Sequence, residues 1–472
     1  MKHYDSIVVG GGIAGMSVAA LLALDDRRVL LVERSSRVGG LVQTIHYDGV
    51  EFPVGAHHLS GSRKNGLVVR ILERLGISTD QLLVPIRQMD VRLDGILYTI
   101  PLSVDDLADF IRREFPQEER FGEFIKELRR YCAYYMGNNE DDLLRFFKET
   151  ASLAFDAYLD RYFQSPCLKR LLSFLGPTYG GLEYHDSAFS HLSLLVSYFC
   201  GTCYVSSGIQ TLIRQLATCL DRLQVDILLH TQYESVIQDG FRVVGINCYN
   251  RITNEQLALT AENVVLTIDP SVTLLNRFPA IRVCRKIEEL RPGPTVIRMV
   301  GTVSQVMDDV KCSDIACIGE KRSVMFELDC ECLPMYMLCY PEMAGGNMPK
   351  GQTSFMLTFL TRTATDLSVQ TLKRQILILL ERFVPDFYAT IKSCCVLPTG
   401  VYRQLSGHPT GAAFGWTRNE RSTMHTNAFA PCVSGVQNLY VCGNWSTDFG
   451  LYGALRSAER VAQVIRKRQQ NV

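Results

Sequence analysis

The chain has 472 residues, and its 49 basic and 49 acidic side chains leave a formal net charge of zero. Its length indicates about two to three domains. A hydrophobic share of 47% supplies a large core and excludes a disordered or fibrous chain. The balanced charge argues against a general nucleic-acid-binding protein and against a polybasic membrane anchor.

The cysteines and the N-terminal segment indicate the cellular compartment of the protein. The 16 cysteines do not show the two C-x-x-C pairs of a zinc ribbon, so we expect no metal site and mostly buried thiols in a reducing environment. Residues 1–5 lead into an apolar run without the hydrophobic segment of a signal peptide. No stretch reaches the ~18 uninterrupted apolar residues of a membrane span. We therefore expect a cytoplasmic protein, with peripheral membrane contact left open.

Residues 6–33 carry the strongest signal for function. An apolar strand over 6–9 runs into Gly10-Gly11-Gly12-Ile13-Ala14-Gly15, which has the spacing G-x-G-x-x-G. A segment without proline over 16–24 predicts a helix, and a second apolar strand over 29–32 ends at Glu33. This order of strand, glycine loop, helix, strand and acid is typical of a dinucleotide-binding unit. The alternative is a glycine-rich turn in another parallel α/β unit.

The residues of this unit have distinct physical roles in binding a dinucleotide. Gly10 allows the tight turn, Gly12 lets the backbone approach a pyrophosphate, and Gly15 lets the helix pack close to the strand. The helix N-terminus offers unpaired N–H groups and a partial positive charge to phosphates. The carboxylate of Glu33 can accept hydrogen bonds from ribose hydroxyls.

The residues after Glu33 distinguish between dinucleotides. Arg37-Val38-Gly39-Gly40 forms an R-x-G-G motif, in which the arginine can add charge-assisted hydrogen bonds and the glycines let the backbone pass close to a cofactor. Here the sequence resembles FAD-dependent oxidoreductases of the glutathione-reductase-like superfamily, within the branch of phytoene desaturases, carotenoid isomerases, retinol saturases and amine oxidases. The resemblance implies an α/β fold, with a Rossmann-type FAD-binding domain and an inserted substrate domain of mixed sheet and helices.

Further segments resemble motifs of the same superfamily. Residues 52–55 resemble its F-D-x-G segment, residues 205–212 a helix entry, and residues 438–444 and 450–454 its C-terminal flavin motif. The resemblance implies that Val236 holds the adenine through its backbone and that the last helix points at the flavin. The implied FAD-binding residues are Gly10, Gly12, Ile13, Ala14, Gly15, Glu33, Arg34, Arg37, Gly39, Gly40, Gly55, Val236, Gly443, Asn444, Tyr452, Gly453 and Ala454.

The sequence departs from the family pattern at several positions. Asn444 stands where the C-terminal motif has aspartate, Leu41 where many amine oxidases have arginine, and Pro53 where F-D-x-G has aspartate. An asparagine can still hydrogen-bond a ribityl hydroxyl. No S-G-G-C-Y pattern is present near the C-terminus, so we expect non-covalent FAD. These departures weaken an amine oxidase assignment more than the flavin assignment.

The nucleotide-binding elements fall into three separated blocks of the chain. Residues 1–95, 205–285 and 425–472 predict a discontinuous FAD-binding domain, and residues 96–204 and 286–424 predict the substrate-binding region. The first substrate segment is rich in aromatic residues, which favours a helical core, an apolar tunnel or a membrane-docking face. The second predicts a mixed sheet that floors the substrate cavity. The expected helices are 104–115, 120–135, 141–163, 165–175 and 371–383, and strands of the mixed sheet are 296–301 and 354–359.

The candidate catalytic residues are few because the flavin carries the chemistry, accepting or returning a hydride at N5. His57 and His58 could act as acid or base, or could be structural histidines bonded to backbone. Trp445 and Tyr452 could form an aromatic wall beside the substrate, or could pack as ordinary core residues. A second G-x-G-x-x-G for a nicotinamide nucleotide is absent from the sequence.

The favoured function is desaturation, the removal of a hydride from a C–C bond of a mainly apolar small molecule of the kind found in secondary metabolism. An alternative is oxidation of a C–N bond in an amine or amino-acid derivative, with O2 as acceptor. Further alternatives are a redox-neutral isomerase that needs reduced FAD and a flavin-bound scaffold without catalysis. We expect a small-molecule partner and no nucleic acid, and the sequence leaves the oligomeric state open.

Overall fold

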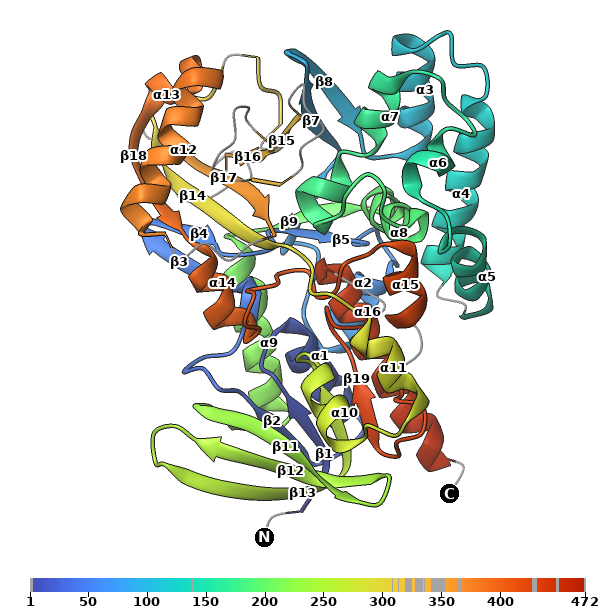
Figure 1. Cartoon of the computed structure of the whole chain (residues 1–472), viewed down its shortest axis with the longest axis vertical. Coiled ribbons are helices and arrows are strands. Elements are labelled where there is room, and N and C mark those ends of the chain that lie inside the picture. Colours follow the sequence, from blue (N-terminus) through green and yellow to red (C-terminus); the bar gives the residue numbers. More distant parts are fainter. Residues whose placement is uncertain are drawn as a thin grey trace.

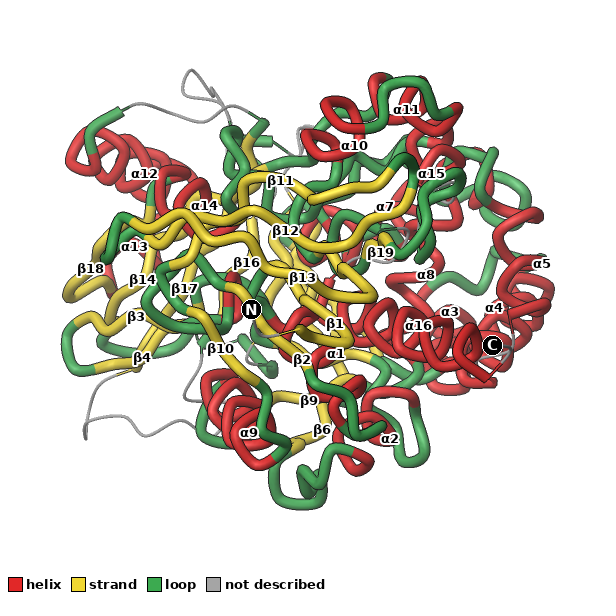
Figure 2. The backbone as a smooth tube through the Cα atoms, turned by 90° about the horizontal axis from the view of Figure 1, so that it is seen from below, coloured by secondary structure: helices red, strands yellow, loops and turns green. Residues whose placement is uncertain are grey.

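The structure, a computed structural model, describes residues 3–470 except 138–139, 308, 313, 319–324, 327–333, 335, 341–352, 363–366, 427–430 and 447–449. It has three parts that meet at a common centre: a parallel sheet with its helices, a second sheet, and a bundle of helices (Figure 1). Viewed from below, the second sheet and the helical bundle lie on opposite sides of the parallel sheet (Figure 2). This is the α/β architecture that the sequence predicts.

Buried apolar strands form the parallel sheet. β1 (His3–Val9) lies between β2 (Val29–Val32) and β13 (Glu255–Leu266) and runs parallel to both. β10 (Asp226–Leu228) extends the sheet beyond β2, and β19 (Leu439–Val441) extends it beyond β13, again in parallel. The carboxyl ends of these strands therefore share one edge, which is where open α/β sheets bind ligands.

An antiparallel extension leaves the parallel sheet through β13. The first half of β13 pairs with β12 (Arg242–Asn250), and β12 pairs with β11 (Thr231–Asp239). The second half of β13 pairs with β1 and β19. Because β11 begins directly after β10, the first residues of β11 lie close to the carboxyl end of β2, where the Thr231 N–H donates to the Glu33 carbonyl at 2.9 Å.

Helices cover both faces of the parallel sheet because alternate residues of β1 point to opposite sides. Val8 packs with one set of helices, while Ile7 and Val9 pack with the other set. The first set is α1 (Ile13–Ala23), α2 (Leu67–Arg74), α9 (Ile209–Arg222) and α16 (Gly450–Gln470), and the second is α10 (Ser271–Arg277) and α11 (Arg282–Glu288). Every residue of α1 is buried, which explains its apolar composition.

The second sheet has the strand order β18-β14-β17-β16-β15-β7-β8. Along β14 (Thr295–Val303), Ile297 and Met299 pack in the cluster that includes α12 (Val369–Phe383), while Arg298 belongs to the opposite face. The remaining elements are β7 (Gln88–Leu93), β8 (Ile96–Pro101), β15 (Asp314–Ile318), β16 (Tyr336–Cys339), β17 (Thr353–Thr361), β18 (Ile391–Leu397) and α13 (Pro385–Thr390). The expected boundary at residue 95 falls between β7 and β8, and both strands belong to this sheet.

The third part is a helical bundle with a core of aromatic side chains, among them Phe146, Phe155 and Tyr158. The prediction of one helix over 141–163 is wrong, because Ala154 leaves the helical path and forms a β-bridge with Ser187. None of the described helices has both the length and the apolarity needed to cross a bilayer. The helices of the bundle are α3 (Val104–Glu114), α4 (Phe121–Gly137), α5 (Glu140–Thr150), α6 (Phe155–Leu159), α7 (Pro166–Leu172) and α8 (Ala188–Phe199).

Short elements connect the three parts. One small sheet has the order β5-β9-β6, and β3 pairs with β4 in another. Their bounds are β3 (Thr44–Tyr47), β4 (Val50–Pro53), β5 (His58–Ser60), β6 (Leu83–Ile86) and β9 (Thr202–Val205). The remaining turns and helices are η1 (Gly40–Val42), η2 (Gly176–Gly180), α14 (Thr399–Ser406) and α15 (Glu420–Thr426).

Cys200 and Cys203 have a C-x-x-C spacing, and both are buried free thiols. The Ser62 hydroxyl donates a hydrogen bond to Cys203 Sγ at 2.9 Å. Burial raises the pKa of the Cys203 thiol, whereas the reactive cysteine of a redox pair has a lowered pKa. The two cysteines therefore pack as small hydrophobic residues.

Candidate active site

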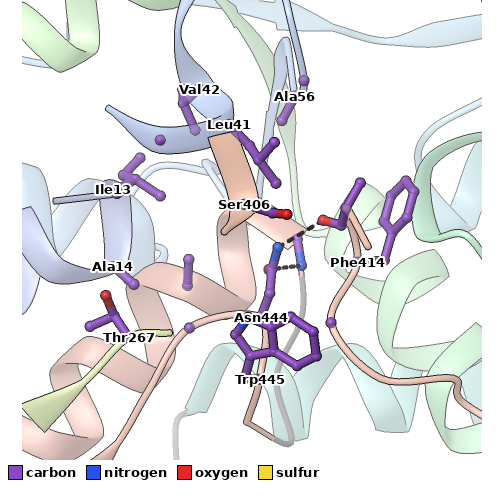
Figure 3. A pocket seen from close by; sticks show the side chains of 18 of the residues that line it. Ile13, Ala14, Leu41, Val42, Ala56, Thr267, Ser406, Phe414, Asn444 and Trp445 are labelled. Atoms are coloured by element: carbon purple, nitrogen blue, oxygen red, sulfur yellow. Dashed lines mark hydrogen bonds between the residues drawn. The ribbon is translucent and has the colours of Figure 1, made fainter. Parts of the chain in front are cut away.

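A cavity of about 520 Å³ lies where the three parts of the molecule meet. Its walls come from the carboxyl edge of the parallel sheet, from the second sheet and from the helical bundle. Figure 3 shows Ile13 and Ala14 at the start of α1, with Leu41 and Asn444 from other segments of the wall. Residues from distant parts of the chain thus converge on one enclosed space, as a ligand site requires.

Most of the expected cofactor residues lie on this cavity. Gly15, Arg37 and Val236, although described by the structure, are not part of its wall. The expected residues that line it are Gly10, Gly12, Ile13, Ala14, Glu33, Arg34, Gly39, Gly40, Gly55, Gly443, Asn444, Tyr452, Gly453 and Ala454.

The glycine loop after β1 presents open backbone to the cavity. Gly12 precedes α1 with φ −71° and ψ 176°, and no side chain caps the helix. Among the described residues, a Cβ at Gly12 would find no atom within 4 Å, so the space beside it is free for a ligand. Gly10 has a left-handed φ of 103°, as the tight turn requires. A Cβ at Gly15 would overlap the Gly10 carbonyl oxygen, so Gly15 allows the close packing of helix and strand.

Glu33 ties the glycine loop to the end of β2. Its Oε2 accepts a hydrogen bond from the Gly11 N–H at 2.6 Å, and its Oε1 accepts one from the Ser35 N–H at 2.8 Å. The residue is 9% exposed and lines the cavity. The sequence predicts a ribose contact for Glu33. The structure adds a second role, because both carboxylate oxygens also accept hydrogen bonds from backbone N–H groups.

The R-x-G-G segment lies against the glycine loop through its glycines rather than through its arginine. The Gly39 N–H donates to the Gly11 carbonyl at 2.8 Å, and Gly39 has a φ of 120° that favours glycine. Arg37 is not among the residues that line the cavity, and its Nη2 donates to the Thr44 carbonyl at 3.4 Å. Arg34 does line the cavity, and its guanidinium donates to the Gln404 carbonyl.

Val236 lies in β11, where it pairs with Ile246 and is 2% exposed. The cavity reaches β11 earlier, at residues 231–234. Gly55 does line the cavity, and a Cβ there would overlap the Leu41 carbonyl oxygen. The backbone of the F-P-V-G segment can therefore pass this close to η1 only with glycine at position 55.

Asn444 caps the last helix. Its Oδ1 accepts a hydrogen bond from the Gly450 N–H at 3.1 Å, and its Nδ2 donates to the Ala413 carbonyl at 3.0 Å (Figure 3). The second bond suits asparagine rather than the aspartate expected from the family motif, since a carboxylate would face the Ala413 oxygen without a proton to donate. Asn444 remains on the cavity wall beside Gly443.

Trp445 and Tyr452 both line the cavity, but each pairs with a different ring. Trp445 packs edge-on against Trp416, with ring centroids 4.7 Å apart. Tyr452 stacks on Tyr135 of α4 at 4.4 Å. Each ring thus has an aromatic partner of its own, and both stay on the cavity wall, where an aromatic wall beside the substrate remains a prediction.

His57 and His58 belong to a buried polar cluster. Asp314 of β15 faces both imidazoles, with its Oδ1 3.4 Å from His57 Nε2 and its Oδ2 paired with His58 Nε2. The Tyr204 hydroxyl donates to the same Oδ2, and the Tyr198 hydroxyl lies 3.2 Å from His58 Nδ1. The side chains of His58 and Asp314 are 2% and 1% exposed. His57, His58 and Tyr198 line the cavity, whereas Asp314 supports them from the second sheet.

The partners of the two histidines could not be predicted from the sequence. Asp314 stands 256 positions after His58, and Tyr198 stands on α8 of the helical bundle. The available signal was an aspartate at the start of an otherwise apolar strand, Asp314-Ile315-Ala316-Cys317-Ile318, because a buried carboxylate needs a partner. That signal does not say which residue the partner is.

Burial and neighbouring charges set the protonation of this cluster. The pKa of His57 is lowered to about 4, chiefly by burial and also by His58 and Arg298, against the opposing effect of Asp314. Burial alone would raise the pKa of Asp314, but His58 and His57 hold it well below its usual value. We therefore expect a neutral His57 beside an ionised Asp314 at neutral pH.

The lowered pKa of His57 predicts a specific titration. In NMR of protein with 15N-labelled histidine, the His57 imidazole should stay neutral until the pH approaches 4. An unfolded chain binds a proton at this residue below about pH 6.5 and the folded chain does not, so acidification should cost about 1.4 kcal/mol of stability per pH unit through His57. A His57→Gln variant assigns the signal. Titration near 6.5 would show that the imidazole is hydrated rather than buried.

Comparison with known proteins identifies the family. A family model described as flavin containing amine oxidoreductase matches residues 13–466. The chain belongs to this family. The resemblance inferred from the glycine and R-x-G-G motifs is thereby confirmed, and so is the α/β fold class. FAD is the cofactor of this flavin amine oxidoreductase family.

Among its relatives, all-trans-retinol 13,14-reductase of Rattus norvegicus is 23% identical over 391 residues, covering 74% of this chain and 60% of the relative. Phytoene desaturase of Cercospora nicotianae is 24% identical over 271 residues, covering 52% of this chain and 42% of the relative. An oxidoreductase structure from Methanosarcina mazei shares the fold, with a TM-score of 0.67 and 14% identity over 98% of this chain and 100% of that chain. The chain thus spans well under two thirds of the length of both sequence relatives.

The cavity fits the cofactor of the flavin amine oxidoreductase family. The free space beside Gly12 and the uncapped start of α1 suit a pyrophosphate, and Glu33 stands where a ribose would follow. The N-terminus of α16 opens on the same cavity at Gly450 and suits the part of a flavin where negative charge develops. None of the described cysteines lines the cavity, in keeping with a non-covalent cofactor.

Proposed function

We propose that the chain is a FAD-dependent oxidoreductase that removes a hydride from a C–C bond of a mainly apolar small molecule. The observation that carries this proposal is the distribution of charge along the cavity. Three of the described residues on the cavity wall carry a carboxylate. Glu234 belongs to β11, while Glu33 and Asp269 lie just beyond the ends of β2 and β13. The buried Arg298 and Arg456 lie on other parts of the wall.

This charge distribution disfavours a cationic substrate. A protonated amine in the part of the cavity away from the nucleotide-binding strands would lack a carboxylate and would meet arginine, at a cost that rises in a buried site. The wall there is largely apolar, with Phe189, Leu194, Val296, Met337 and Phe414. An apolar substrate is the ligand that such a wall would hold.

The names of the relatives support a reaction at carbon–carbon bonds. One is named a phytoene desaturase and another an all-trans-retinol 13,14-reductase. The alternative, oxidation of a C–N bond in an amine with O2, has the description of the family model in its favour. Against it stand the buried Arg298 and Arg456 on the cavity wall, which would meet the positive charge of a protonated amine.

Different parts of the cavity wall would have different roles in this reaction. FAD, when bound, supplies the hydride acceptor. The glycine loop and Glu33 would hold its nucleotide half, and the N-terminus of α16 would stabilise negative charge near the ring. The apolar walls would exclude water and orient the substrate, and the cluster around His57 and His58 supplies groups that can hold or move a proton.

The proposal predicts a yellow protein that releases its flavin on heating. Under anaerobic conditions, adding an apolar polyene such as all-trans-retinol should change the flavin absorbance, whereas primary amines should not. Peroxide release on adding amines would favour C–N oxidation, and turnover that appears only after dithionite would favour an isomerase. Colourless protein that does not take up added FAD would overturn the cofactor assignment.

A further inference from the structure

Asp314, His58 and Tyr198 lie in one line of polar contacts that leads to the cavity. The Asp314 carboxylate pairs with His58 Nε2, and His58 Nδ1 lies 3.2 Å from the Tyr198 hydroxyl. Each ring nitrogen of His58 therefore has its own partner, a carboxylate on one side and a phenol on the other. A carboxylate that fixes an imidazole so that its second nitrogen faces a hydroxyl is an arrangement suited to acid–base catalysis.

The ring of His58 is fixed by its neighbours. Tyr179 stacks on it at 5.0 Å with an angle of 25°, and Tyr204 meets it edge-on at 4.9 Å. The His57 ring lies 4.3 Å away. Because aromatic rings surround the imidazole, it keeps its two polar partners without rotating, which a proton relay requires.

Tyr198 brings this line to the cavity wall. It lies near the end of α8, and Ser193, Leu194 and Ser197 line the same cavity. Residues three and four positions apart share one side of a helix, so this side of α8 faces the cavity. The phenol of Tyr198 therefore belongs to the cavity wall and lies 3.2 Å from His58 Nδ1.

We propose that Asp314, His58 and Tyr198 form a proton relay, in which Tyr198 is the catalytic residue that exchanges a proton with the substrate and Asp314 is a positioning residue for His58. The inference rests on the proposed function, because a desaturation removes a hydride and a proton from adjacent carbons. FAD, when bound, would supply the two-electron acceptor for the hydride. The substrate proton goes to the Tyr198 oxygen while the phenol hydrogen passes to His58 Nδ1. The substrate is left neutral with a new C=C bond.

The surrounding charges fit this direction of transfer. The step leaves an imidazolium at His58, and the adjacent Asp314 carboxylate compensates its charge. Burial raises the pKa of Tyr198 well above its usual value, and Asp314 adds to the shift. The phenol therefore stays protonated by itself. In the proposed step it must accept the substrate proton while it donates its own hydrogen to His58 Nδ1. The other ionisable groups around the relay are His57 just before β5, Tyr179 on η2, Tyr204 on β9, Arg298 on β14 and Cys339 on β16.

The contacts of the relay can be tested without any substrate. In NMR of the full chain with 15N-labelled histidine, Tyr198→Phe should shift the His58 Nδ1 resonance, and Asp314→Asn should move the Nε2–H signal upfield. The matched control is Asp90→Asn. Asp90 is a buried carboxylate on the neighbouring β7 that accepts the Lys311 and Cys312 N–H groups, so its loss perturbs the same sheet without touching His58.

Kinetics of FAD-loaded protein test the catalytic role. With a polyene that reduces the flavin, Tyr198→Phe should slow the reduction by about a hundredfold or more and change KM little. Asp314→Asn should also shift the pH profile of flavin reduction, whereas Asp90→Asn should leave that profile in place. A merely structural effect would be shared by both aspartate variants.

The outcomes separate the relay from the proposed function. Unchanged His58 resonances in both Tyr198→Phe and Asp314→Asn would overturn the relay, whether or not FAD binds. Normal NMR responses in a protein that never takes up FAD would overturn the proposed function and leave the contacts standing. Flavin reduction in Tyr198→Phe at the wild-type rate across the pH range would overturn the catalytic role of Tyr198.

Discussion

A Gly12→Val variant is expected to fold normally and to lose FAD. Gly12 has φ −71° and ψ 176°, an extended conformation that valine adopts readily. A Cβ there would meet no described atom within 4 Å, so the added side chain occupies only the space beside the uncapped start of α1, where a pyrophosphate would bind. The affinity for FAD, measured by flavin fluorescence titration, should fall at least about a hundredfold, or about 2.7 kcal/mol.

Two other glycine variants separate exclusion of the ligand from damage to the fold. Gly122→Val places the same side chain in open space on α4, outside the cavity wall, and should leave FAD binding unchanged. Gly15→Ala would push a Cβ into the Gly10 carbonyl oxygen, and it should lower the thermal midpoint of the cofactor-free protein. Full FAD occupancy in Gly12→Val would contradict the assignment of the loop.

The nucleotide end of the site could be predicted because its determinants are local. Gly10 and Gly12 lie in the turn between β1 and α1, Gly15 lies in the first turn of α1, and Glu33 directly follows β2. The steric demands of such a turn act over a few residues, so they appear directly as spacing. The buried parallel strands could be predicted for a similar reason, since strands covered on both faces appear in the sequence as continuous apolar runs.

Side-chain direction was harder to predict than position along the chain. Arg37 follows the family motif, yet its guanidinium lies near the Thr44 carbonyl rather than on the cavity. Val236 lies on the expected strand two residues beyond Glu234, which lines the cavity, and its implied backbone contact with the adenine stays a prediction. A motif fixes where a residue stands in the sequence, whereas packing against the rest of the fold decides which way its side chain points.

The polar cluster depends on contacts that the sequence does not encode locally. His58, Tyr198 and Asp314 come from a short connecting strand, the helical bundle and the second sheet. The adjacent histidines were visible as candidates, because histidine titrates near neutral pH. Their partners could be found only once the three parts of the fold were assembled, since no spacing relates residues so far apart.

Glu33 is expected to contribute both to the stability of the fold and to the binding of the cofactor. Its two oxygens accept the Gly11 N–H at 2.6 Å and the Ser35 N–H at 2.8 Å. A hydrogen bond to a charged group contributes about 1.5–3 kcal/mol, so the loss of two such bonds in Glu33→Ala should lower the free energy of unfolding of the cofactor-free protein by about 3–6 kcal/mol, measured by urea denaturation. FAD binding should weaken by about 1–3 kcal/mol as the ribose contact is lost. Glu123→Ala removes an exposed carboxylate on α4 and should change neither quantity.

A Glu33→Gln variant separates the two roles. Glutamine keeps the length of the side chain but has one acceptor oxygen, and its amide N–H2 would face one of the two backbone donors. About half of the stability loss should therefore remain, and a ribose hydroxyl would meet a neutral amide in place of a carboxylate, which is the stronger acceptor. ADP, which contains the ribose and the pyrophosphate without the flavin, should then bind more weakly to both Glu33 variants than to the wild type. If ADP affinity stays at the wild-type level while stability falls, Glu33 acts only on the loop and another residue holds the ribose.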